Sequence, residues 1–300
     1  MERKTVRLGF MGFGEAGWHF AKGLSQAGLT GIMAYSRSGA RAAPGEPLYE
    51  RAREAGVELV KSPRELCKRA ELIMAVTQGR SALAALRSVR RYLRPGHVYM
   101  DASAAPVKAM EKGAELIGSS AAFGDAAILG PVPVEGLRVL ILASGPGAAP
   151  FRDALNPYGM NIEVMEGPPG AASAMKLIRS VFMKGITGLL FESLEAAERY
   201  GIRAALEEDI ARWINERPFS QVINRFVGST AIHGERRMHE MEDVLALLRG
   251  LKSSTRMTRA THAWFKEVAG MGLGEVFGGK VPEKAAPVIQ ALVERRKTGE

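Results

Sequence analysis

Cysteine is almost absent from this sequence. The single cysteine, Cys67, has no second cysteine to pair with, so the chain forms no internal disulfide and holds no cysteine-based metal site. The fold therefore needs neither an oxidising compartment nor zinc, and no histidine spacing indicates another set of metal ligands. We expect a cytoplasmic protein without a metal site.

Long apolar runs and blocks of like charge are also missing. Nowhere do 18 apolar residues follow one another, and residues 1–4 do not begin a secretory leader, so we expect neither a membrane span nor a signal peptide. The formal net charge of +9 suits an anionic partner. Because the lysines and arginines are scattered and not interleaved with aromatic residues, we expect this partner to be a small anionic substrate, with no nucleic acid and no membrane.

The residues that are present suit a globular protein of two domains. Hydrophobic residues make up 46% of the 300 residues and charged residues 24%, and a chain of this length allows about two domains. In the first half, short apolar runs alternate with helical stretches, which indicates βαβ units and a parallel sheet. We predict a Rossmann-type, doubly wound α/β domain that binds NADP over residues 1–166. Its strands are expected at residues 6–11, 31–35, 57–60, 72–76, 98–101, 121–126, 139–143 and 161–165.

The pattern changes after residues 167–170, because no strand pattern follows and apolar residues recur at helical spacing. Residues 167–300 are therefore predicted to form an all-helical domain for substrate binding and dimerisation. It begins with a helix over residues 171–200, about 45 Å long at about 1.5 Å per residue, that joins the domains. Further helices are expected at residues 203–212, 219–226, 235–248, 254–268 and 283–296, with a glycine-rich loop at 270–279. Apolar faces at residues 189–190 and 244–248 indicate a homodimer if they are exposed in the monomer.

Local signals also place a short helix in the first domain. Ser62 is the expected N-cap of a helix over residues 63–69, with proline at its first position, and Glu65 completes a capping box.

A glycine-rich turn follows the first expected strand. Its sequence, Gly12-Phe13-Gly14-Glu15-Ala16-Gly17, fits the pattern G-x-G-x-x-G and opens a helix expected over residues 16–27. In this pattern the first glycine permits the tight turn, the second lets a pyrophosphate approach the backbone, and the third packs the helix against the sheet. The positive end of the helix then faces the phosphates. Because a strand precedes the turn and a helix follows it, we predict that all six residues bind a dinucleotide.

The end of the second strand favours NADP over NAD. A dinucleotide-binding fold usually carries an acidic residue about 20 residues after the turn, which holds the ribose 2′-hydroxyl of NAD. This chain has Ser36 and Arg37 instead, whose hydroxyl and guanidinium groups suit a 2′-phosphate. The alternatives are that Arg37 is a solvated surface arginine and that the cofactor is NAD. Thr77, directly after the strand at residues 72–76, is also expected to contact the cofactor.

Lys176 is the candidate acid or base in the second domain. It stands one to two turns inside the long helix among small and apolar residues. An inward-facing ammonium would be partly desolvated, which lowers the pKa of a lysine as acid–base catalysis requires. From the residues alone, a solvated surface lysine is the commoner interpretation.

Four short motifs follow one another along the chain. They are GFGEAG at residues 12–17, DASAAP at 101–106, GDAAILGP at 124–131 and GAASAMK at 170–176. In this order they resemble the β-hydroxyacid dehydrogenase family, which includes 3-hydroxyisobutyrate and 6-phosphogluconate dehydrogenases. The C-terminal third resembles a subgroup of 6-phosphogluconate-dehydrogenase-like oxidoreductases whose C-terminal domain has no assigned function.

The resemblance implies an enzyme that transfers a hydride between NADP and a small β-hydroxyacid or the matching semialdehyde. The family's glycines fall on Gly12, Gly14 and Gly17, and its serine or threonine beside the nicotinamide and substrate falls on Ser103. Its catalytic lysine falls on Lys176, which takes the proton of the β-hydroxyl as hydride leaves the carbon, and returns it in the reverse reaction. The family also implies a homodimer.

Several positions depart from the family pattern where the substrate would bind. The stretch Leu129-Gly130-Pro131 stands where the family reads Ser-Gly-Gly, so a hydroxyl contact and a backbone donor are lost. Ser180 and Lys184 lie four and eight residues after Lys176 and can share its helix face. An extra cation there favours an anionic substrate, unless Lys184 is a solvated charge. The residues predicted to contact substrate are Ser103, Leu129, Gly130, Ser180 and Lys184.

Met183 stands where decarboxylating members of the family carry a glutamate acid, so we expect simple oxidation or carbonyl reduction. Two other functions stay open. An imine or keto-acid reductase on the same scaffold would turn over C=N compounds or bulky ketones but not β-hydroxyacids. A non-catalytic sensor would bind NADP tightly and turn over nothing.

Overall fold

A computed structural model of the chain describes residues 6–298. The residues on which we based the expected lack of a leader lie outside this range. The chain divides into two compact units, residues 1–180 and 181–300, and the division falls inside helix α8 (Ala171–Tyr200). Across residues 6–298, no helix combines the length and the apolar composition that a membrane span requires.

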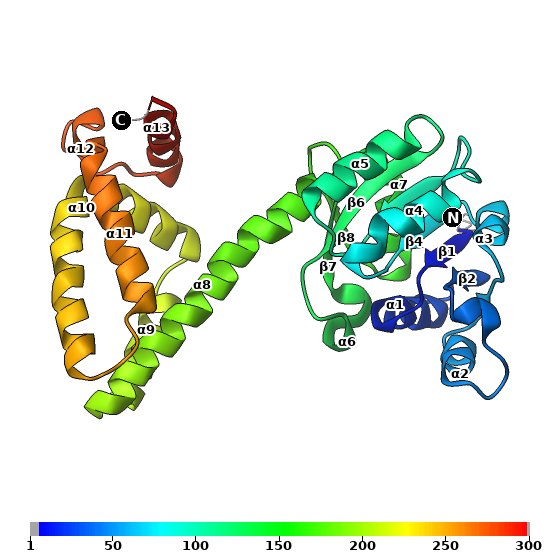
Figure 1. Cartoon of the computed structure of the whole chain (residues 1–300), viewed down its shortest axis with the longest axis horizontal. Helices are drawn as coiled ribbons and strands as arrows, with labels where there is room; N and C mark the ends of the chain where they lie inside the picture. Colours follow the sequence, from blue (N-terminus) through cyan, green and yellow to red (C-terminus); the bar gives the residue numbers. More distant parts are fainter. Residues whose placement is uncertain (1–5, 299–300) are drawn as a thin grey trace. The chain divides into compact units, whose positions relative to one another are not determined.

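The first unit is built on one eight-stranded sheet (Figure 1). In space its strands follow the order β3-β2-β1-β4-β5-β6-β7-β8. Their bounds are β1 (Leu8–Met11), β2 (Ile32–Tyr35), β3 (Val57–Leu59), β4 (Leu72–Ala75), β5 (Val98–Asp101), β6 (Ala122–Ile128), β7 (Leu140–Ser144) and β8 (Asn161–Val164). The strand order reverses at β1, which is the arrangement of Rossmann-type domains. All eight expected strands are present, and the predicted Rossmann-type fold is confirmed.

The sheet is parallel except at one pair, which the sequence pattern did not predict. β6 and β7 run antiparallel, with Asp125 opposite Ser144, and the other pairs are parallel. Residues 129–139 connect the two strands, whereas a parallel crossover needs a dozen or more residues. This connection holds only the short helix α6 (Val132–Glu135) and a 3-10 turn. The reversal places Asp125, in the middle of β6, opposite Ser144 at the carboxyl end of β7.

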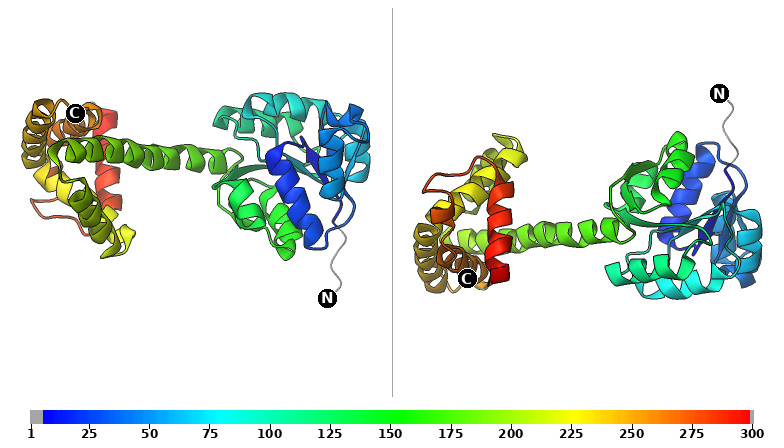
Figure 2. Two further views of the ribbon diagram at one scale, coloured as in Figure 1. Left: turned by 90° about the horizontal axis from the view of Figure 1, so that it is seen from below. Right: turned by 90° about the horizontal axis from the view of Figure 1, so that it is seen from above.

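Helices cover both faces of this sheet (Figure 2). One face packs α1 (Glu15–Gln26), α2 (Pro47–Glu54) and α7 (Ala148–Leu155), and the other packs α3 (Pro63–Arg69), α4 (Ala82–Arg90) and α5 (Val107–Ile117). Leu8 and Phe10 of β1 lie in the first core cluster and Met11 lies in the second. Alternate side chains of a strand point to opposite faces, so a central strand serves both cores.

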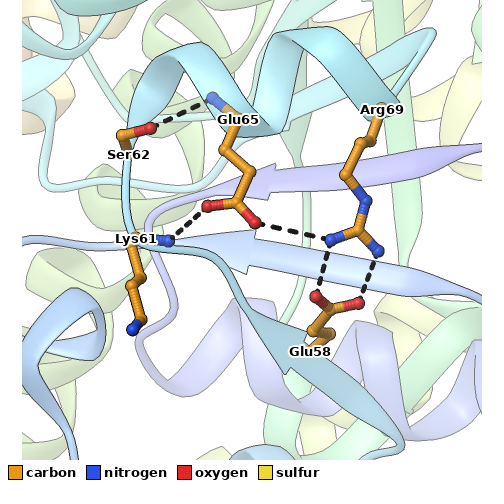
Figure 3. Close-up of polar contacts among 5 residues, drawn as sticks. All are labelled: Glu58, Lys61, Ser62, Glu65 and Arg69. Carbon is orange, nitrogen blue, oxygen red and sulfur yellow. Dashed lines mark hydrogen bonds and ion pairs between the residues drawn. The ribbon is translucent and has the colours of Figure 1, made fainter.

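The short helix α3 shows how local signals fix an element (Figure 3). The Ser62 hydroxyl accepts a hydrogen bond from Glu65 N at 3.1 Å, which confirms the predicted N-cap. The Glu65 carboxylate accepts from the backbone N of Lys61 at 3.0 Å, one residue before the cap, rather than from Ser62 N as the predicted capping box requires. Arg69, in the last turn, donates to both carboxylate oxygens of Glu58 on β3 at 2.6 and 2.5 Å. These contacts hold the helix against the edge of the sheet.

In the second unit, helices are the only regular secondary structure among the described residues (Figure 1). After the rest of α8, it contains α9 (Arg203–Asn215), α10 (Phe219–Gly250), α11 (Arg256–Gly270), α12 (Leu273–Val276) and α13 (Ala285–Thr298). From residue 171 to 298 the structure describes no strand, and the predicted all-helical C-terminal part is confirmed.

Two details of this helical part differ from the prediction. The helices expected at residues 219–226 and 235–248 lie on either side of a kink in α10, where His233 adopts φ −113° and ψ 25°, and the first helix continues past residue 226. The expected loop at residues 270–279 contains the short helix α12. Glycines at both places, Gly234 and Gly274, lowered the helical signal in the sequence.

The predicted domain boundary after residue 166 lies between the last strand and α8. The first compact unit runs past that point to residue 180, and the first turn of α8 is hydrogen-bonded to Asp125 of β6 and Ser144 of β7. We propose residue 166 as the end of the cofactor domain, since β8 ends at Val164.

Candidate active site

The glycine turn between β1 and α1 uses its three glycines in three ways. Gly12 has φ +95°, and a Cβ there would lie 3.0 Å from the carbonyl oxygen of Val76. A Cβ on Gly14 would meet no atom within 4 Å, so this backbone faces open space. A Cβ on Gly17 would lie 3.0 Å from the Val76 side chain, where α1 packs on the sheet. Turn, open approach and close packing are the requirements of a pyrophosphate-binding loop.

A pocket of about 510 Å³ lies over this turn, at the carboxyl ends of β1, β2 and β4. It brings together six of the residues predicted to bind cofactor: Gly12, Phe13, Gly14, Ser36, Arg37 and Thr77. Glu15, Ala16 and Gly17 continue into α1 and do not line it. Among the residues that the structure describes, none that lines this pocket is acidic, and Arg37 is its one charged group.

The loop after β2 is ordered by its own hydroxyl groups. Ser36 Oγ accepts a hydrogen bond from Gly39 N at 2.8 Å and lies 3.4 Å from Ser38 Oγ. Ser36, Arg37 and Ser38 all line the pocket, and the Arg37 side chain is exposed. Two hydroxyls and a guanidinium at the end of a strand can bind an anion such as a phosphate.

Ser103 is held beside the pocket from two sides. Its backbone N donates to Asp101 Oδ1 at 2.9 Å, and its hydroxyl accepts from Thr77 N at 3.2 Å and lies 2.9 Å from Thr77 Oγ1. Thr77 lines the pocket, whereas Ser103 is buried behind it. Burial raises the pKa of Asp101 to about 6, against the opposing effect of the hydrogen bonds from Ser103.

A second buried carboxylate, Asp125 on β6, binds the start of α8. Its Oδ2 accepts from Gly170 N at 3.1 Å and from Ser173 N at 2.8 Å, and its Oδ1 accepts from the Ser173 hydroxyl at 2.6 Å. Ser144 on β7 accepts from Ala172 N at 3.1 Å. Burial raises the pKa of Asp125, and these hydrogen bonds oppose the rise.

Sequence reasoning assigned no role to Asp101 or Asp125, although both stand in motifs that it singled out. The signal was available, because an aspartate inside an apolar strand must find hydrogen-bond donors when it is buried.

The remaining predicted residues lie in different places. Lys176 is half-buried in the second turn of α8, and Ser180 donates its hydroxyl proton to the Lys176 carbonyl at 2.9 Å. Leu129 and Gly130 follow β6, with the Glu135 carboxylate against Gly130. Lys184 is exposed and belongs to the second compact unit. None of these residues lines the pocket over the glycine turn.

Two family models match the chain. Residues 7–146 match the NAD binding domain of 6-phosphogluconate dehydrogenase, and residues 197–268 match a domain of unknown function. One solved relative is a conserved protein of unknown function with structural similarity to 3-hydroxyacid dehydrogenases. It is 31% identical over 89% of this chain and 99% of its own, with a TM-score of 0.61. The chain belongs to the β-hydroxyacid dehydrogenase family.

Two other solved structures are similar to this member of the β-hydroxyacid dehydrogenase family. A conserved hypothetical protein from Sinorhizobium meliloti is 27% identical over 97% of both chains, with a TM-score of 0.62. An imine reductase variant from Myxococcus stipitatus, in complex with NAD+, is 20% identical over 96% of this chain and 100% of its own, with a TM-score of 0.73. The second likeness concerns the fold alone. The chain thus has the nicotinamide-nucleotide-binding fold of dehydrogenases and reductases.

Proposed function

We propose that the protein is an NADP-dependent oxidoreductase that transfers a hydride between the nicotinamide and a small β-hydroxyacid or the matching semialdehyde. Lys176 is the general acid and base, and the substrate is anionic. In the oxidative direction the lysine amine accepts the hydroxyl proton while the carbon loses its hydride, so the carbonyl forms and the lysine becomes an ammonium. The bound cofactor supplies the hydride acceptor. We also propose a cytoplasmic homodimer.

The observation that carries the cofactor assignment is the pocket over the glycine turn. Gly14 leaves its backbone open to a pyrophosphate, while Ser36, Ser38 and Arg37 line the strand end where the ribose would bind. An aspartate at this point would bind a ribose hydroxyl but repel a 2′-phosphate, and the described lining has no acidic residue. This supports NADP over NAD.

Titration of the purified protein with NADP and with NAD tests this preference. Wild type should bind NADP more tightly than NAD. Arg37→Ala should weaken NADP binding by roughly 10- to 100-fold, because a hydrogen bond to a charged group contributes about 1.5–3 kcal/mol. Binding of NAD should change little. Arg41→Ala removes an exposed arginine that does not line the pocket and is the matched control. Equal affinities of wild type for the two cofactors would refute the assignment.

The role of Lys176 is tested with a panel of substrates. NADPH oxidation is followed with small aldehydes and keto acids, and NADP reduction with β-hydroxyacids. Lys176→Ala should keep its cofactor affinity and lose roughly 100- to 10,000-fold in turnover, the usual contribution of a general acid or base. Lys108→Ala, an exposed lysine on α5, is the control. A fully active Lys176→Ala variant would remove the lysine from the mechanism.

An imine or keto-acid reductase is the second candidate. Leu129 stands where the family carries a serine hydroxyl, and it follows β6 as a half-buried apolar side chain. An apolar group there suits a substrate without the family's carboxylate contact. Turnover of cyclic imines or bulky ketones, with none of β-hydroxyacids, would support this candidate. Tight NADP binding without any turnover would support a sensor instead.

A further inference from the structure

Two buried carboxylates stand side by side at the carboxyl end of the sheet. Asp101 on β5 and Asp125 on β6 are register partners in the parallel pair of these strands, and both are almost fully buried. Asp101 holds the turn of Ser103, which contacts Thr77 at the cofactor pocket. Asp125 holds the start of α8, the helix that carries Lys176. Asp101 therefore supports a residue beside the cofactor pocket, and Asp125 supports the helix that carries the lysine.

The Asp125 carboxylate accepts hydrogen bonds from backbone N–H groups at the start of α8. The first N–H groups of a helix have no acceptor within the helix. Gly170 N and Ser173 N both donate to Asp125, Ala172 N donates to Ser144 Oγ, and Ala171 N donates to a loop carbonyl. The Ser173 hydroxyl adds a further bond to Asp125 at 2.6 Å. A negative charge at this end of a helix also interacts favourably with the helix dipole.

Apart from Ala172, which is fully buried, apolar side chains contribute little packing in the first two turns of α8. Leu177 is 53% exposed and Ile178 is 69% exposed, so the side chains beside Lys176 do not fix the helix to the sheet. Ser173, which is bound to Asp125 through both its backbone and its side chain, lies three residues before Lys176. Three residues make about 4.5 Å of helix, less than one turn, so the lysine backbone moves with the anchored turn.

We propose that Asp125 is a positioning residue for Lys176: by binding Gly170 and Ser173 it fixes the first turn of α8 on the sheet that carries the cofactor pocket. The proposal rests on the proposed acid–base role of Lys176. Asp125 acts through the helix backbone and takes no proton from the substrate. Its loss misplaces the amine while leaving the glycine turn, Ser36 and Arg37 intact, and a misplacement of about 1 Å costs on the order of 100-fold in rate.

Three variants test this in the full chain. Asp125→Ala removes all three bonds. Asp125→Asn keeps an oxygen that accepts from both backbone N–H groups and an amide that donates to the Ser173 hydroxyl. Ser144→Ala, the matched control, removes one neutral acceptor from the same turn. For each variant, NADPH affinity, kcat and KM on the substrate identified in the panel, and hydrogen exchange of the amides of residues 170–180 are measured.

We expect the NADPH affinity of Asp125→Ala to stay within about threefold of wild type. Its kcat should fall on the order of 100-fold, and the amides of residues 170–180 should lose protection from hydrogen exchange. Asp125→Asn should recover most of the turnover and the protection, and Ser144→Ala should change kcat much less. Wild-type kcat in Asp125→Ala would overturn the proposal. So would a parallel loss of NADPH affinity in Asp125→Ala and Asp125→Asn, because that result describes a general defect of the sheet domain.

If Asp125→Ala does not fold, Ser173→Ala replaces it, since this variant removes only the 2.6 Å bond. It should lower kcat with NADPH affinity unchanged, and an unchanged kcat would overturn the proposal. Failure of the proposed function has a separate signature. If Lys176→Ala keeps full turnover, the lysine has no catalytic role and the proposal falls with it, even where the exchange data show that Asp125 holds the helix.

Discussion

At the scale of single residues, Asp101 makes the stability of the first unit depend on pH. Its carboxyl group is buried, and its pKa is raised from 3.8 to about 6 by that burial. A raised pKa means that the folded state holds the proton more tightly than the unfolded state. The protonated Asp101 carboxyl group therefore contributes its full stabilisation of the folded state below about pH 4. This contribution is lost as the pH rises through about 6.

Replacing Asp101 by asparagine should remove this dependence. The amide oxygen can still accept from Ser103 N, and no charge has to be buried at neutral pH. The free energy of unfolding of Asp101→Asn, relative to wild type, should rise between pH 4 and pH 7 by up to about 3 kcal/mol and then level off. Urea unfolding of both proteins at each pH unit measures the difference. A constant difference across this range would contradict a raised pKa.

The candidate site was predicted unevenly at this scale. The glycines, Ser36, Arg37 and Thr77 were found because a phosphate-binding turn depends on residues close together in sequence. Asp125 received no role because its partners, Gly170 and Ser173, lie more than forty residues away and meet it only through the fold.

At the scale of elements, α3 offers a comparison between a cap and an ion pair. Ser62→Ala leaves Glu65 N without its acceptor and should lower the free energy of unfolding by about 1 kcal/mol. Arg69→Ala breaks an ion pair with Glu58 whose side chains are 40% and 55% exposed, and should cost about 0.2–1 kcal/mol. Urea unfolding at low and high salt distinguishes the two contributions, because only the loss of stability in Arg69→Ala should become smaller as the salt concentration rises. Salt-sensitive loss in Ser62→Ala would contradict this assignment.

Elements were predictable where their signal is local. The eight strands follow from short apolar runs, and α3 begins where its N-cap serine and its proline indicate. The connection between β6 and β7 is too short for a parallel crossover, so β7 runs antiparallel to β6. The predicted end of β6 was two residues too early, which made this connection look long enough for a parallel arrangement. Helix α10 passes Ala269 of α11 closely at Gly234, beside its kink, and no local pattern contains this contact.

At the scale of the whole chain, the second unit leaves apolar surface uncovered. Leu189, Leu190 and Leu247 are 46%, 39% and 52% exposed, whereas Leu245 and Leu248 are buried. The sequence predicted apolar faces at these two places but not which leucines would remain exposed, because that depends on the neighbouring helices. Leu189 and Leu247 line one apolar groove of about 430 Å³ within the second unit.

We expect this surface to lie in the interface of the proposed homodimer, so a charge placed there should weaken the dimer. Leu247→Glu would bury an unpaired carboxylate on association, and the dimer dissociation constant should rise at least about 30-fold, equivalent to about 2 kcal/mol. Val134→Glu is the matched control, since Val134 is 79% exposed on α6 in the first unit. Sedimentation equilibrium of both variants and of wild type measures the constant. Because Leu247 is half exposed within its own chain, the substitution leaves the fold of the monomer intact, and a dimer as tight as wild type would place the interface elsewhere.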